Sequence, residues 1–131
     1  EAGKKLAAAP DALLQVDSHW TGKGITHTTD SKGQYLLERS DVNLFVTSRK
    51  GDKFAFRFVK HVHNQPDLVT AEEAQLGDLE RVGAKWYRRF TWGSGPGSRT
   101  GWIGGDQIVA KSIGGDNRWN AESKFKLVGK P

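Results

Sequence analysis

Apolar and polar residues alternate along most of this chain in short runs that end at glycine-rich turns. Phe54, Phe56 and Phe58 are separated by one residue each, a two-residue period that places all three rings on one face of a strand. Runs of this kind end at Gly51-Asp52 and at Gly104-Gly105-Asp106, where glycine supplies the positive φ angles that tight hairpins need. The pattern predicts an antiparallel β-meander with the three phenylalanines in its core.

The turns divide the chain into strands joined by hairpins, without long helical crossovers. Such a meander favours a closed barrel or a strongly curved sheet, because closure removes exposed strand edges. We therefore predict an all-β fold, an antiparallel up-and-down β-barrel of about eight strands. The expected strands are Ser18–Thr28, Gln34–Arg39, Val42–Ser48, Lys53–His63, Ala84–Trp92, Arg99–Gly104, Gln107–Ile113 and Arg118–Val128.

Two segments depart from the alternation and predict short helical pieces. Pro10 interrupts the apolar segment Lys4–Gln15, so only a short N-terminal helical turn is expected there. Thr70-Ala71-Glu72-Glu73 matches a helix capping box, and Leu76 and Leu79 follow three residues apart. The sequence therefore predicts one short inserted helix over Thr70–Arg81, placed to cover one end of the barrel.

Length and composition set the organisation of the chain. Its 131 residues make a single core, divided into an N-terminal extension (1–16), a barrel domain (17–128) and a tail (129–131). The formal net charge is +5 and cysteine is absent, which excludes disulfides and thiolate chemistry. No apolar run approaches the length of a membrane span. Because the chain begins at Glu1 without methionine, we expect a processed mature protein, extracellular or periplasmic, with an excised domain as the alternative.

Three short motifs resemble calycin-type barrels, the lipocalin and avidin-like superfamily, and small bacterial secreted barrel modules. They are Asp17-Ser18-His19-Trp20-Thr21-Gly22, the strand–turn–strand segment Leu44–Phe54, and Gly101–Ile108. The resemblance implies that Trp20 plugs the base of the barrel. The lipocalin order of glycine before tryptophan is reversed here, since Gly22 follows Trp20. The resemblance therefore implies the barrel and carries over no ligand site.

An aromatic and basic strand supplies the first candidate site. Trp86, Arg88, Phe90 and Trp92 occupy alternate positions and share one face. An arginine among rings on a core-facing stripe is costly unless it is paired or hydrated. Arg88 is therefore predicted to mark a polar point in a barrel cavity, suited to a carboxylate, a sulfate or a sugar hydroxyl. The alternative is that Arg88 pairs with an acidic side chain or lies near the rim.

A glycine-rich loop, Gly93–Ser98, interrupts the meander next to this strand. Recognition residues are often placed on loops that a rigid scaffold holds, and tryptophans flank this one. The predicted ligand- or partner-binding residues are therefore Trp86, Arg88, Trp92, Arg99 and Trp102.

Other chemistry is weakly represented, so no catalytic residue, metal site or cofactor is predicted. His19 and His27, like His61 and His63, share a strand face by parity, and surface histidines are the ordinary interpretation, with zinc or copper as the alternative. The expected function is a non-catalytic exported barrel that binds a small-molecule ligand or a protein partner, or serves as an accessory subunit. The alternative is a basic surface that recognises acidic polysaccharide or nucleic acid.

Overall fold

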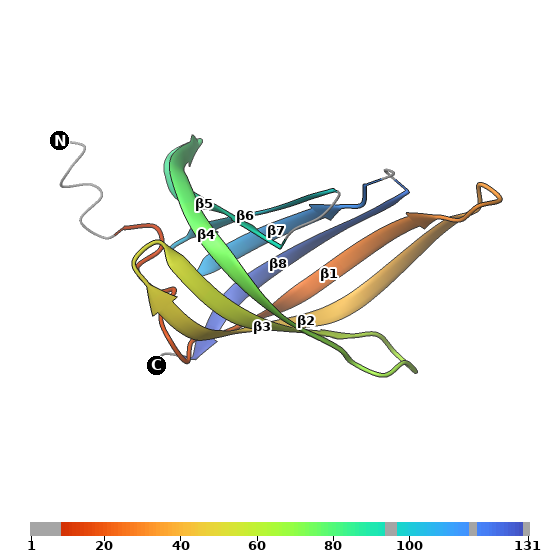
Figure 1. Cartoon of the computed structure of the whole chain (residues 1–131), viewed down its shortest axis with the longest axis horizontal. Helices are drawn as coiled ribbons and strands as arrows, with labels where there is room; N and C mark the ends of the chain where they lie inside the picture. The colour runs from red at the N-terminus through yellow and green to blue at the C-terminus, as the bar shows by residue number, and fades with distance from the viewer. Residues whose placement is uncertain (1–8, 94–96, 116–117, 130–131) are drawn as a thin grey trace.

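The computed structural model describes residues 9–93, 97–115 and 118–129 as one closed barrel of eight strands (Figure 1). Each strand pairs antiparallel with the next, and β8 pairs back onto β1 from Trp20–Leu127 to Thr28–Trp119. The prediction of an all-β up-and-down barrel is confirmed. The strands are β1 (His19–Thr29), β2 (Tyr35–Lys50), β3 (Lys53–His61), β4 (Leu68–Val82), β5 (Lys85–Trp92), β6 (Ser98–Gly104), β7 (Gln107–Ile113) and β8 (Trp119–Gly129).

The core lies inside the barrel and is built from alternate residues of the strands. Phe54 and Phe56 of β3 are buried, and Phe58 packs against them with part of its surface exposed, as the two-residue period predicts. Phe90 of β5 meets Phe54 edge-on, with 5.2 Å between ring centroids. The Phe90 ring lies over Gly101, where a Cβ atom would come within 2.2 Å of it. Glycine at this position therefore lets the ring pack directly against the backbone of β6.

The predicted inserted helix is wrong, because Thr70–Arg81 lies within the strand β4. Thr70 and Glu73, the capping-box residues, pair across the sheet with Phe58 and Ala55. The pairing of β4 with β5 has a bulge between Leu76 and Leu79. This bulge accommodates their three-residue spacing, which resembles a helical period. Backbone pairing on both sides of β4 outweighs the local capping signal.

The predicted N-terminal helical turn is also wrong over the residues that the structure describes. Residues 9–18, here named the plug segment, form separate turns closed by the bonds Ala12 N–Ala9 O and Leu14 N–Asp11 O. The Arg49 guanidinium donates to the carbonyl oxygens of Asp11 and Leu14, so these carbonyls serve tertiary contacts. Residues 1–8, the rest of the predicted extension, lie outside the described part of the chain. No membrane-spanning helix is found among the described residues.

The structure joins two of the predicted strands, and parts of the predicted loop and tail lie outside its described residues. The predicted strands Gln34–Arg39 and Val42–Ser48 form the single long strand β2, because Ser40 and Asp41 continue the pairing with β1. Residues 94–96 of the Gly93–Ser98 loop lie outside the described residues, as do residues 130 and 131 of the predicted tail.

Candidate functional site: a cavity at the open end of the barrel

One end of the barrel is closed by the plug segment, and we call it the closed end (Figure 1). Leu14 and Trp20 are fully buried there, and Trp20 Nε1 donates to Ser18 Oγ over 3.0 Å. The Gly105 amide of the β6–β7 turn donates to the Pro10 carbonyl. Trp20 is thus packed under the segment that closes the barrel, in the position that the calycin resemblance implies.

Charged side chains at the closed end are bound to one another. The buried Asp11 carboxylate contacts the Arg49 guanidinium at 2.5 Å and the Arg88 guanidinium at 3.8 Å. Arg88 also contacts Asp52 at 3.1 Å and donates to the Gly77 carbonyl at 2.8 Å. Arg88 therefore pairs with acidic side chains, as one of the two sequence interpretations has it, and these contacts fix the plug to β2 and β5.

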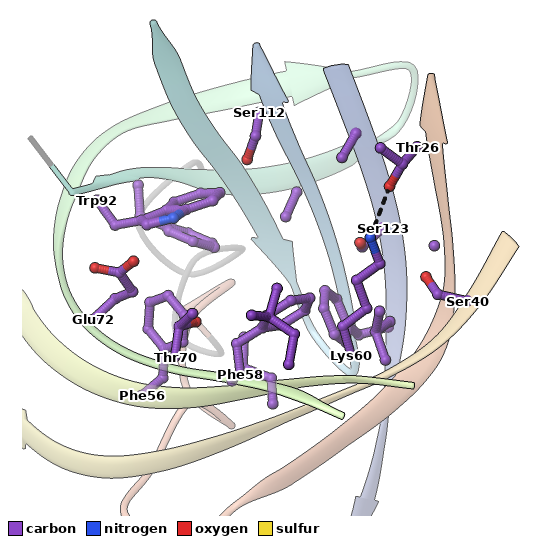
Figure 2. Close-up of a pocket in the computed structure, with 18 of the residues that line it drawn as sticks. Thr26, Ser40, Phe56, Phe58, Lys60, Thr70, Glu72, Trp92, Ser112 and Ser123 are labelled. Atoms are coloured by element: carbon purple, nitrogen blue, oxygen red, sulfur yellow. Dashed lines mark hydrogen bonds between the residues drawn. The ribbon is translucent and has the colours of Figure 1, made fainter. Parts of the chain in front are cut away.

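The opposite end, here named the open end, contains a cavity of about 170 Å³. Figure 2 shows Trp92, Phe56 and Glu72 together on one side of this cavity, and Thr26, Ser40, Ser123 and the end of the Lys60 side chain on the other. Every strand except β6 contributes to the lining. The lining residues are Gly24, Thr26, Ser40, Val42, Leu44, Phe56, Phe58, Lys60, Leu68, Thr70, Glu72, Phe90, Trp92, Ala110, Ser112, Trp119, Ala121, Ser123 and Phe125.

Lys60 brings a positive charge to one side of this cavity. Its ammonium donates to Thr26 Oγ1 at 3.3 Å and contacts the Glu38 carboxylate at 2.7 Å. The Lys60 side chain is only 19% exposed, and a partly buried ammonium is stable where a carboxylate balances it. The charge of Lys60 is thus already neutralised by the protein.

Glu72 brings a negative charge to the other side, beside Trp92 and Phe56 (Figure 2). It pairs directly with Phe56 across the sheet, and the Phe56 and Trp92 rings meet edge-on at 6.1 Å. Within the described part of the chain, no hydrogen bond or ion pair reaches the half-buried Glu72 carboxylate. The cavity therefore holds one carboxylate that the described residues do not balance.

Hydroxyl groups complete the polar lining. Within residues 9–93, 97–115 and 118–129, the hydroxyls of Thr70, Ser112 and Ser123 have no protein hydrogen-bond partner. No fully buried side-chain polar atom in these ranges lacks a partner, so the three hydroxyls reach accessible space. Gly24 lies between Ser40 and Ser123, and a Cβ atom there would come within 2.7 Å of Ser40 Oγ. Glycine thus keeps this part of the cavity open.

The five predicted site residues do not form one site. Trp92 lines the cavity, whereas Trp86 pairs with Arg81 near the β4–β5 turn and Arg88 belongs to the closed end. Trp102 lies outside the barrel, where its Nε1 donates to Glu80 at 3.2 Å and Lys111 approaches its ring. Arg99 pairs with Ser112 in the β6–β7 register, and its side chain runs beside Gly93. Their binding roles stay predictions.

Three of the four histidines make local contacts, and these contacts are separate from one another. His19 stacks on Phe45 at 4.4 Å and His61 contacts Asp67 at 2.7 Å, while His27 contacts the Tyr35 hydroxyl. Among the described residues, no cluster of three or more potential metal ligands occurs.

The sequence interpretation missed Lys60 and Glu72, the two charged lining residues. The signal for Lys60 was present, because the period of Phe54, Phe56 and Phe58 continues to residue 60. Glu72 follows the same rule on β4, counting back from Ala74 and Leu76, but the helical interpretation of that segment concealed it.

No protein-family model, curated protein or solved structure matches this chain. The barrel is compatible with a calycin-like fold.

Proposed function

We propose that this protein is a non-catalytic binding barrel that holds a small ligand in the open-end cavity. The observation that carries the proposal is the lining, which combines aromatic walls with a few polar groups that lack protein partners. This combination is typical of ligand sites, where apolar surface supplies affinity and convergent polar groups fix orientation.

The size of the cavity limits the ligand. A cavity of about 150 Å³ in another protein binds benzene, and this one measures about 170 Å³. The expected ligand is therefore the size of a ring with a short substituent. It enters past Leu68 and Trp119, which line the mouth and are 54% and 37% exposed.

A cavity-filling variant tests the proposal. Ala121 lines the cavity, whereas Ala71 lies exposed on β4 outside it, so Ala121→Phe and Ala71→Phe form a matched pair. With 2-phenylethanol as the probe, titration calorimetry is expected to show saturable binding to the wild type and to Ala71→Phe. Ala121→Phe is expected to weaken binding at least about tenfold, because the new ring occupies the ligand volume. Equal binding to both variants would place the probe elsewhere.

A second candidate function has an observation of its own on the outer surface. Lys23 of β1 lies directly across from Lys124 of β8, and Lys126 follows on the same face. Lys124 and Lys126 are exposed and make no ion pair among the described residues. Such a row suits a polyanion, and its binding must weaken with salt. Salt-sensitive retention on heparin that Lys124→Glu and Lys126→Glu abolish would favour this function, and retention that they leave unchanged would exclude this surface.

A further inference from the structure

Two charged side chains line the open-end cavity, and only one of them is bound by other side chains of the described protein. Lys60 is held by Glu38 at 2.7 Å and by Thr26 at 3.3 Å. Glu72 faces the same cavity and has no such contact among the residues that the structure describes. A carboxylate at a partly dehydrated apolar wall is costly without a counter-charge. A bound cation would supply that counter-charge.

The surroundings of Glu72 are suited to a cation of a particular kind. Phe56 lies directly across the sheet from Glu72, and Trp92 pairs with Ala74, two residues further along β4. The two rings are set edge to face at 6.1 Å, and Figure 2 shows both beside the carboxylate. Aromatic rings attract organic cations through their negative faces, and tryptophan does so most strongly.

We propose that the cavity ligand is a small organic ammonium ion, with its charged group at Glu72 and its apolar body among the aromatic walls. The inference rests on the proposed function of the cavity and names the chemical class of its ligand. The Glu72 carboxylate accepts one ammonium hydrogen, and the Thr70 hydroxyl, two residues before it on the same face, is placed to accept another. The apolar body occupies the inner part of the cavity, where Phe90 and Phe125 lie.

Three probes of matched shape separate the charge from the apolar body. They are 2-phenylethylammonium, the neutral 2-phenylethanol and the anionic 3-phenylpropanoate, each titrated into the whole protein by calorimetry at neutral pH and low salt. The wild type is expected to bind the ammonium probe about tenfold more tightly than the neutral one. It is expected to bind the anion more weakly than either.

Glu72→Gln and Glu73→Gln are the matched variants, because Glu73 is the next residue on β4 and lies exposed outside this cavity. Glu72→Gln is expected to weaken 2-phenylethylammonium binding about tenfold and so remove the preference for ammonium, whereas Glu73→Gln is expected to keep both the affinity and the preference. If the neutral or anionic probe binds as tightly as ammonium, the cation class is overturned while the ligand cavity stands. If none of the three probes binds, the proposed ligand-binding function fails together with the cation class.

Discussion

The two ends of the barrel use the same strands but differ in how fully the protein binds their polar side chains, since at the open end Lys60 is paired and Glu72 is not. At the closed end, Asp11, Arg49 and Arg88 are bound to one another or to backbone carbonyls. At the open end, Thr70 and Glu72 face accessible space without a protein partner in the described structure. Buried polar groups are normally satisfied within a fold. The difference therefore separates side chains that hold the barrel together from side chains that are available to a ligand.

The largest effect is expected from removing a ring in the packed core beside the closed end. Phe54 is 2% exposed and contacts Phe90, so Phe54→Ala leaves a cavity and costs about 3–5 kcal/mol of unfolding free energy. Trp119 at the open end is 37% exposed, and Trp119→Ala is expected to cost about 1 kcal/mol. Urea unfolding followed by circular dichroism measures both. Equal losses would show that the two ends contribute alike to stability.

A smaller effect is expected from breaking the ion pairs of the plug segment. Asp11→Asn leaves the guanidinium groups of Arg49 and Arg88 without the carboxylate that binds both, and the expected loss is about 1–3 kcal/mol. Asp67→Asn is the control, because its contact with His61 at the open end is half exposed and worth little. A loss for Asp67→Asn as large as that for Asp11→Asn would contradict the distinction between the ends.

The smallest loss of stability is expected from breaking the exposed Lys23–Asp41 pair on the outer wall, which serves as a reference for the losses at the two ends. A hydrogen bond from Lys23, assisted by the charge of Lys23, lowers the pKa of the exposed Asp41 carboxyl. A lowered pKa in the folded state contributes stability at neutral pH, and this is lost as the pH falls through that pKa. Asp41→Asn is therefore expected to reduce the melting temperature slightly at neutral pH and low salt. The difference should vanish at strongly acidic pH, and a larger difference in acid would refute this pair.

Much of the barrel follows from the sequence, because alternation and turns are local signals. Phe54, Phe56 and Phe58 mark an inward face by spacing alone, and Gly51-Asp52 marks a hairpin. The strand β4 is different, since its capping-box residues and the spacing of Leu76 and Leu79 satisfy a helical rule. Its pairing with β3 and β5 depends on residues of the two neighbouring strands, which lie outside the few residues over which a capping box or a helical period is read.

The candidate site was harder to predict than the fold. Trp92 was found, because aromatic residues on a core-facing stripe stand out. Arg88 has the same parity as Trp92, but only the positions of the plug segment and of the β2–β3 turn show that Asp11 and Asp52 bind it. Parity identifies the face of a strand and does not identify which end of the barrel a residue occupies. Glu72 was hidden because the strand that carries it was predicted to be a helix.

If the open end binds a small ligand and the closed end is structural, a ligand should affect only the open end. A map of backbone amide chemical shifts with saturating 2-phenylethylammonium distinguishes the two ends. We expect the largest changes on cavity-lining residues, including Thr70, Glu72 and Ser112, while the amides around Asp11 and Trp20 stay unchanged. Changes centred on the plug segment, or spread over the outer lysines with none in the cavity, would contradict this division between the ends.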